Sequence, residues 1–261
     1  MQTINLIDRK GCKVIEFPDG ELHLELDGID RKEEVWIECR ICNGNDLFLL
    51  MQLSDILKRQ CVRVCQIDIY YLMGMRCDRL FDLYRPFTLG IVADVINSFN
   101  AKKVIVCEAH SKRTVEEIRN CVSLSQMYEN IIGKDCLFVS PDKGARERYT
   151  RLKFSVVCSK KRDAATGDLL GFEEEALENV EGKDLMVVDD LCDGGGTFVG
   201  LAPKLRELKP ASLSLLVTHA VQKKGIENVA AVYDKVYITD TYKDWEKEDL
   251  PSNVEVNVVT K

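Results

Sequence analysis

The sequence contains no run of about 18 apolar residues, which is the length that a membrane-spanning helix requires. Its first residues, MQTINLIDRKGCK, also lack the long apolar core of a secretory signal peptide. Positive charge is not in excess, because the formal net charge is −7 at pH 7. A general nucleic-acid binder normally carries a basic face. These absences predict a cytoplasmic protein that binds neither membranes nor nucleic acid, and they favour a small-molecule enzyme.

Cysteine, by contrast, is plentiful: 11 residues are spread along the 261 positions. Without a signal peptide they are expected to be reduced thiols, many of them inside apolar runs, as Cys158 is. Cys39-x2-Cys42 and Cys61-x3-Cys65 resemble two halves of a zinc site. However, Cys39 and Cys65 fall within strand-like runs rather than on knuckle turns, so reduced structural cysteines are the favoured interpretation.

Short apolar or β-branched runs alternate with helical patterns along the chain, which predicts parallel sheets covered by helices. Strands are expected at 35–39, 62–70, 104–108, 137–140, 155–159, 185–189, 212–218, 235–239 and 254–259. Helices are expected at 46–58, 88–100, 115–129, 145–153, 198–209 and 226–233. The predicted class is α/β, with two doubly wound parallel-sheet domains at 1–133 and 134–261, each of ordinary domain size.

The segment LMVVDDLCDGGGTF, residues 185–198, carries the clearest chemical signal. A buried strand ends in two acids and a glycine-rich turn that leads into a helix, and ligands of open α/β sheets bind at the carboxyl ends of strands. Glycine backbone and a helix N-terminus suit an anion, whereas Asp189 and Asp190 suit hydroxyl groups. This combination predicts a sugar-phosphate site. The alternative is that Gly194–Gly196 only forms a tight turn.

The same segment resembles the phosphoribosyl-diphosphate (PRPP) motif shared by type I phosphoribosyltransferases and PRPP synthetases. The resemblance implies that Asp189 and Asp190 bind the 2- and 3-hydroxyls of ribose. It assigns the 5-phosphate to the loop that follows, namely Asp193, Gly194, Gly195, Gly196 and Thr197. That family usually has threonine where this chain has Gly194, so a hydroxyl donor is missing and space opens beside the 5-phosphate.

Two further segments resemble PRPP synthetases rather than transferases. FPDGE at Phe17–Glu21 is similar to their F-x-D-G-E element, which contacts the adenine of ATP bound to a neighbouring subunit. MRCDR at Met75–Arg79 is similar to their A-R-Q-D-R segment, with Cys77 in place of glutamine. The alternative for its two arginines is an ordinary surface pair. The resemblance implies that ATP is bound by Phe17, Asp19, Glu21, Arg76, Asp78 and Arg79.

Four more matches follow in the family's order. VCEAHS resembles V-D-L-H, which implies that His110 contacts Mg-ATP, and VSPDKGARER resembles V-S-P-D-x-G, which implies that Asp142 is a metal ligand. SKKRD resembles the start of the mobile catalytic loop, which implies catalytic roles for Lys160 and Arg162. THA, with His219, resembles the T-H-P element. The alternatives are a structural His110, a helix N-cap at Asp142 and a solvated charge run at Lys160–Arg162.

The chain is thus identified as a trimmed and divergent member of the PRPP synthetase family. The implied reaction transfers the β,γ-diphosphate of Mg-ATP to the 1-hydroxyl of ribose 5-phosphate and releases AMP, in nucleotide biosynthesis. Mg²⁺ is the implied cofactor, and the implied assembly is a homo-oligomer whose subunits share the ATP site. Gly194 leaves open an extended acceptor such as ADP-ribose, in NAD metabolism. A phosphoribosyltransferase that uses PRPP and a non-catalytic regulatory subunit are two further hypotheses.

Overall fold

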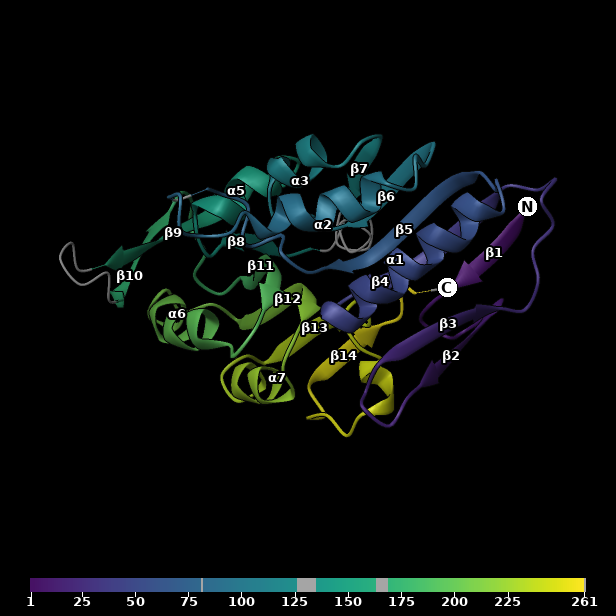
Figure 1. Ribbon diagram of the computed structural model, residues 1–261. Helices are drawn as coiled ribbons and strands as arrows, with labels where there is room; N and C mark the ends of the chain where they lie inside the picture. The colour runs from purple at the N-terminus through teal and green to yellow at the C-terminus, as the bar shows by residue number, and fades with distance from the viewer. Residues whose placement is uncertain (81, 126–134, 163–168, 261) are drawn as a thin grey trace. The chain divides into compact units, whose positions relative to one another are not determined.

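The computed structural model describes residues 1–80, 82–125, 135–162 and 169–260, with the side chains of residues 160–172 left out of the description. The chain separates into two compact units, Met1–Ser125 and Gln126–Lys261 (Figure 1). The predicted domain boundary at 133/134 lies outside the described residues and stays a prediction.

The first unit contains a five-stranded parallel sheet in the order β1-β4-β5-β6-β7. Its strands are β1 (Gln2–Asn5), β4 (Val35–Ile41), β5 (Val64–Leu72), β6 (Lys103–Cys107) and β7 (Cys121–Leu124). Its described helices are α1 (Gly44–Arg59), α2 (Thr88–Asn97) and α3 (Lys112–Glu117). Between β1 and β4 the chain forms an antiparallel hairpin of β2 (Cys12–Glu16) and β3 (Leu22–Leu26).

Helix α1 begins where the sequence provides a cap. The Asn43 side chain accepts hydrogen bonds from the backbone N–H groups of Asn45 and Asp46, and the Asp46 carboxylate accepts one from the N–H of Asn43. This capping box satisfies donors that the first turn of a helix leaves without partners. The helix buries Leu49 and Leu53, so an apolar stripe of α1 lies in the core of the first unit.

The second unit contains a seven-stranded sheet in the order β10-β9-β8-β11-β12-β13-β14. The strands are β8 (Leu137–Ser140), β9 (Phe154–Arg162), β10 (Leu169–Ala176), β11 (Asp184–Cys192), β12 (Ser212–Ala220), β13 (Lys235–Thr239) and β14 (Val254–Asn257). All pairings are parallel except that of β10 with β9. The described helices are α5 (Lys143–Arg148), α6 (Gly196–Glu207) and α7 (Lys223–Ala230), with a 3-10 turn η1 (Trp245–Lys247).

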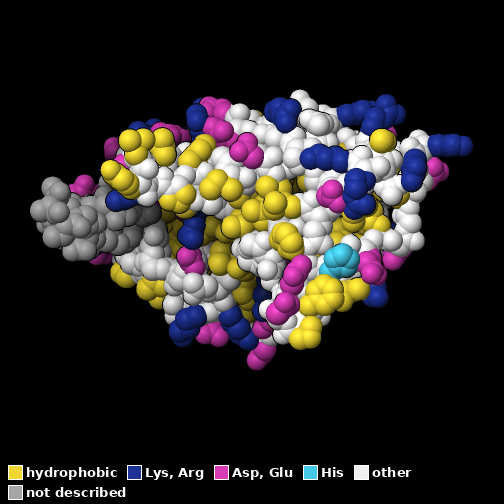
Figure 2. Space-filling view, in the orientation of Figure 1, with side chains coloured by type: hydrophobic (Ala, Val, Ile, Leu, Met, Phe, Trp, Pro, Cys, Tyr) yellow, Lys and Arg dark blue, Asp and Glu magenta, His cyan; other side chains and the backbone are white. Residues whose placement is uncertain are grey.

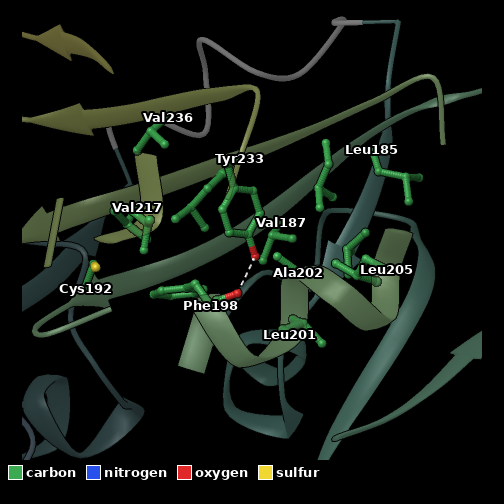
Figure 3. Close-up of a cluster of buried hydrophobic side chains, with 14 of the residues drawn as sticks. Leu185, Val187, Cys192, Phe198, Leu201, Ala202, Leu205, Val217, Tyr233 and Val236 are labelled. Carbon is green, nitrogen blue, oxygen red and sulfur yellow. Dashed lines mark hydrogen bonds between the residues drawn. The ribbon is translucent and has the colours of Figure 1, made fainter. Parts of the chain in front are cut away.

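Consecutive residues of β11 are buried. Successive side chains of a strand point to opposite faces, so β11 is covered on both. Leu185 and Val187 join the core formed with α6 and α7, where the Tyr233 hydroxyl donates to the Phe198 carbonyl at 3.1 Å (Figure 3). Met186 belongs to the other cluster, which contains residues of α5. Helices therefore cover both faces of this sheet, and the predicted α/β class with doubly wound parallel sheets is confirmed.

Several expected elements differ in their bounds from the structure; α5, for example, ends at Arg148 rather than at residue 153. The helix expected at 115–129 was wrong over 118–125, because α3 ends at Glu117, Asn120 takes a left-handed φ of 56°, and β7 follows at Cys121–Leu124. Its remaining residues, 126–129, lie outside the described part of the chain. The strand expected at 155–159 continues to Arg162 and pairs with β10, which the sequence pattern did not indicate.

Candidate active site

The acid pair Asp189 and Asp190 lies near the carboxyl end of β11, the central strand of the seven-stranded sheet. The two residues are buried, with 8% and 2% of their surface exposed. Strand β8, which is the neighbour of β11 in the sheet, leads into α5 on one face. Strand β11 leads into α6 on the other face. A crevice opens where neighbouring strands send their helices to opposite faces, which is where open α/β sheets bind ligands.

Arg148, the last residue of α5, forms ion pairs with both acids. Its Nη1 lies 3.0 Å from Oδ1 of Asp189 and 3.0 Å from Oδ1 of Asp190. The Arg148 side chain is 10% exposed, so these contacts are shielded from water. The sequence did not single out Arg148. A buried acid pair requires a nearby cation, but the pattern could not distinguish Arg148 from Arg146 on the same short helix.

Burial raises the pKa of Asp189 well above its usual range, and the negative charge of Asp190 raises this pKa further. The guanidinium of Arg148 opposes the shift, and the nearby Asp142 adds to it. The pair therefore has more negative charge than its surroundings compensate. Hydroxyl donors or a cation that reached these oxygens would be bound favourably for that reason.

The glycine-rich loop follows directly. Gly195 takes a left-handed φ of 80° at the N-cap of α6, a conformation that glycine adopts without steric cost. Gly196 and Thr197 form the first turn of this 12-residue helix, whose N-terminal N–H groups favour an anion. Gly194 is exposed, and a Cβ built on it would meet nothing within 4 Å. Asp193 accepts a hydrogen bond at its Oδ1 from Gln222 Nε2 at 2.7 Å.

Asp142 lies between β8 and α5 and is the N-cap of that helix. Its Oδ1 accepts a hydrogen bond from the Ala145 N–H at 3.0 Å. A Cβ built on Gly144 would lie 3.3 Å from this oxygen and 3.9 Å from Nη2 of Arg148, so the carboxylate is close to the arginine of the acid pair. The capping alternative is therefore observed. It uses one oxygen, and the predicted role of Asp142 as a metal ligand stays a prediction.

Lys160 and Arg162 belong to β9, which pairs with Phe172 and Leu169 of β10 at these positions. Their side chains lie outside the described part of the chain, as do residues 163–168. The catalytic roles predicted for them therefore stay predictions. The backbone places them in a two-stranded arm, because β9 continues past Val157, the partner of Ser140 in β8.

In the first unit, two predicted segments follow neighbouring strands. Arg76, Asp78 and Arg79 lie in the loop after β5, where Nε of Arg79 is 3.7 Å from Oδ1 of Asp78. His110 lies between β6 and α3 and is partly buried. Because β5 and β6 pair in parallel, both segments emerge at the carboxyl edge of the same sheet. This is the edge at which such sheets bind ligands.

The FPDGE segment forms the exposed tip of the β2–β3 hairpin. The Phe17 N–H donates to the Glu21 carbonyl at 2.9 Å, and the Glu21 N–H donates to Oδ1 of Asp19 at 3.1 Å. Gly20 completes the turn with a φ of 87°. Phe17 is 44% exposed, and its ring lies 6.0 Å from that of the exposed His23. The turn is thus ordered by its own hydrogen bonds while its aromatic ring faces solvent.

The cysteines show no sign of a zinc site. All eleven are free, and among the described residues no group of three or more His, Cys, Asp or Glu side chains is arranged to hold a metal ion. Burial raises the pKa of the Cys39 and Cys42 thiols, whereas zinc binds the thiolate form. His219 is fully buried, and its Nδ1 lies 2.9 Å from Oγ1 of Thr241, which gives it a structural contact.

No helix in the described residues has the length and apolar character needed to span a bilayer. On the face shown in Figure 2, Lys and Arg side chains lie in several groups separated by apolar, polar and acidic surface.

Comparison with known proteins identifies relatives along almost the whole chain, although no protein-family model matches it. The ribose-phosphate pyrophosphokinase of Campylobacter jejuni is 29% identical over 266 residues, covering 95% of this chain and 83% of that protein. Ribose-phosphate pyrophosphokinase 2 of Archaeoglobus fulgidus is 28% identical over 246 residues, covering 90% and 86%. The phosphoribosylpyrophosphate synthetase from Mycobacterium smegmatis matches in fold, with a TM-score of 0.78 at 20% identity, covering 95% of this chain and 86% of that one.

The chain is similar along nearly its whole length to ribose-phosphate pyrophosphokinases and shares the fold of a phosphoribosylpyrophosphate synthetase. This similarity confirms the fold that the resemblance to PRPP synthetases implied, and it shows that the chain is an enzyme of the transferase class. The acid pair and the glycine-rich loop of the second unit form the candidate site.

The ion pairs of Arg148 predict a pH-dependent loss of stability in Arg148→Met, a variant that keeps most of the side-chain volume. Removing one partner of a buried ion pair leaves uncompensated charge, so we expect the free energy of unfolding to fall by roughly 3–5 kcal/mol at neutral pH. An uncompensated buried carboxyl has a folded pKa above its unfolded value near 4, so the folded state gains a proton as the pH falls. The loss should therefore shrink with falling pH, and denaturant titrations at neutral pH and about pH 5 measure it.

The matched control is Arg146→Met, because Arg146 is exposed on the same helix. Its effect is expected to stay within about 0.5 kcal/mol. An equal loss in both variants, or a loss in Arg148→Met that does not change with pH, would contradict the assignment of Arg148 to the acid pair.

Proposed function

We propose that this enzyme transfers the β,γ-diphosphate of Mg-ATP to the 1-hydroxyl of ribose 5-phosphate, producing PRPP and AMP. The observation that carries the proposal is the buried acid pair at the end of β11, directly followed by a glycine-rich loop and the N-terminus of α6. It occurs in a chain that is similar over 95% of its length to a ribose-phosphate pyrophosphokinase. One end of the site suits hydroxyl groups and the other suits a phosphate, as a ribose 5-phosphate requires.

The acceptor would bind along this site in one orientation. Its 5-phosphate lies on the N–H groups from Asp193 to Thr197, and its 2- and 3-hydroxyls donate to Asp189 and Asp190. Arg148 holds the acid pair in place through its two 3.0 Å contacts. Fixed in this way, the 1-hydroxyl is directed away from the loop, so positioning supplies part of the catalysis.

The reaction forms a bond between the 1-oxygen of ribose and the β-phosphorus of ATP. The bond between that phosphorus and the oxygen bridging to the α-phosphorus breaks, AMP leaves with the bridging oxygen, and the hydroxyl proton passes to solvent. Lys160 and Arg162 stabilise the negative charge that develops on the transferred group. No side chain is required to act as a strong base.

The nucleotide is assigned to Arg76, Asp78, Arg79 and His110 at the carboxyl edge of the first sheet, and to the hairpin tip at Phe17–Glu21. The exposed Phe17 ring suits stacking on adenine presented by another subunit of a homo-oligomer. Asp142 in the second unit and His110 in the first are each proposed, separately, to contact Mg²⁺, because a carboxylate oxygen and an imidazole nitrogen can both bind a divalent cation. A bound Mg²⁺ would neutralise negative charge on the phosphates of ATP.

A second acceptor is favoured by one observation. Gly194 is exposed, and a Cβ there would meet nothing within 4 Å, so the loop leaves open space beside the proposed 5-phosphate. An acceptor with a larger group on that phosphate, such as ADP-ribose, fits this opening. The relatives are named for ribose phosphate, which keeps ribose 5-phosphate as the first proposal.

The reaction is tested by incubating the enzyme with Mg-ATP and, separately, ribose 5-phosphate, ADP-ribose and unphosphorylated ribose. We expect AMP release with ribose 5-phosphate and none with ribose, because ribose lacks the group that the loop binds. Release with ADP-ribose alone would replace the first acceptor by the second. ATP-independent consumption of PRPP would indicate a phosphoribosyltransferase, and inactivity towards all these substrates would indicate a regulatory subunit.

Replacing Lys160 by alanine is expected to lower kcat at least 100-fold with little change in KM for ribose 5-phosphate. A cation that acts on the developing charge of the transition state contributes mainly to kcat. Lys153→Ala is the matched control, since Lys153 is exposed and directly precedes β9. A loss of less than tenfold in Lys160→Ala, or equal losses in both variants, would remove Lys160 from the catalytic machinery.

Gly194→Thr tests the acceptor. Because a Cβ at this position meets nothing within 4 Å, the substitution should leave the fold unchanged. The added hydroxyl can donate to a phosphate, so we expect KM for ribose 5-phosphate to fall about threefold to tenfold. Any turnover of ADP-ribose should fall, because the side chain fills the opening. Steady-state rates of AMP release with each acceptor measure both effects, and an unchanged ratio of the two would dissociate Gly194 from acceptor choice.

A further inference from the structure

Helix α7 contains a buried glycine, Gly225, in its first turn. A Cβ built on Gly225 would lie 1.8 Å from the carbonyl oxygen of Asp193 and 2.9 Å from its carbonyl carbon. Both atoms belong to the backbone of the glycine-rich loop, which cannot rotate away as a side chain would. Glycine at this position of α7 therefore allows the loop backbone to lie directly on the helix.

The contact requires glycine on the loop as well. A Cβ built on Gly195 would lie 2.9 Å from the carbonyl oxygen of Gly225 and 2.9 Å from Cγ1 of Val229. Gly195 also has the left-handed φ of 80° that places it at the N-cap of α6. Two glycines separated by 30 positions in the sequence (225 − 195) thus bring the two backbones together.

Two side chains, of the α7 N-cap residue Gln222 and of Asn228 within the helix, bind the same loop. Nε2 of Gln222 donates to Oδ1 of Asp193 at 2.7 Å, and Nδ2 of Asn228 donates to the carbonyl oxygen of Gly194 at 3.1 Å. Gly225 and Asn228 are three apart and lie on the same side of α7, and Gln222 contacts the loop from the N-cap. The helix is itself fixed, because Ile226 is buried in the core of the second unit.

We propose that Gln222, Gly225 and Asn228 are positioning residues, which together form a loop clamp that holds the glycine-rich loop in its anion-binding conformation. The phosphate role of this loop rests on the proposed function. The clamp touches the loop through Asp193, Gly194 and Gly195, and it leaves the α6 N-terminus to the ligand. A loop ordered before binding loses less conformational freedom when the phosphate arrives, which lowers KM and aligns the 1-hydroxyl.

The test compares Gly225→Ala with Gly44→Ala in the full-length enzyme. Both glycines lie in helices, but a Cβ on Gly44 would meet nothing within 4 Å. We expect Gly225→Ala to raise KM for ribose 5-phosphate at least tenfold and to lower kcat up to about 100-fold, the effect of a displacement of about 1 Å in a positioned site. KM for ATP should change less than twofold. Gly44→Ala should match wild type in all three constants.

Asn228→Ala and Gln222→Ala keep the proposal testable if Gly225→Ala does not fold, because each removes one hydrogen bond without adding atoms. Each is expected to raise KM for ribose 5-phosphate about threefold to tenfold, and the double variant should exceed either single one. Asn228→Gln should restore part of the acceptor affinity that Asn228→Ala loses, because it retains an amide donor. If these residues were only structural, KM for ribose 5-phosphate and KM for ATP would change together.

Hydrogen exchange of the backbone amides from Cys192 to Phe198 separates the clamp from the proposed activity, because it needs no ligand. Faster exchange in the clamp variants, with unchanged exchange in β13, supports the clamp even if wild type does not turn over ribose 5-phosphate. A wild-type enzyme that does not turn over ribose 5-phosphate would contradict only the proposed substrate and not the clamp. Exchange and acceptor KM that both match wild type in Asn228→Ala and Gln222→Ala would overturn the clamp.

Discussion

The ion pairs between Arg148 and the acid pair are the interaction on which the geometry of the second unit's site depends. Two carboxylates, 8% and 2% exposed, lie side by side in the sequence at the end of a buried strand, an arrangement that repulsion and desolvation oppose. The guanidinium, 3.0 Å from each, offsets part of that cost and ties the end of β11 to α5. Burial and the charge of Asp190 still raise the pKa of Asp189 despite the nearby guanidinium, so Arg148 compensates only part of the negative charge.

The sheet topology brings the arginine and the glycine-rich loop to the acid pair. Strands β8 and β11 are neighbours, and the helices that follow them lie on opposite faces of the sheet. The arginine therefore approaches from one side of the sheet and the glycine-rich loop from the other. The core beneath α6 and α7 fixes the loop side, with Tyr233 joined to the carbonyl of Phe198 (Figure 3). Charge on one side and backbone N–H groups on the other create a site with two chemically distinct ends.

Much of this site was predictable because its chemistry is contiguous in the sequence. The run from Asp189 to Thr197 contains the acids, the glycines and the helix start, and the strands at 137–140 and 235–239 were predicted with their observed bounds. Contacts between distant segments were not predictable. Arg148 meets the acid pair across 41 positions (189 − 148), and only the three-dimensional structure shows why a glycine occurs in α7. Local pattern also failed at Cys121–Leu124, where residues in an edge strand continued a helix-like spacing.

Adjacent positions of the glycine-rich loop differ in the space around them. Gly195 is enclosed by Gly225 and Val229, so a side chain there has no room, whereas Gly194 faces open space one residue earlier. Asn228 holds the carbonyl of Gly194 at 3.1 Å, which fixes the direction in which that opening faces. An open position and an enclosed position are thus adjacent in the loop. Under the proposed function, a change at Gly194 would alter which acceptor fits, whereas the backbone at Gly195 would stay where α7 places it.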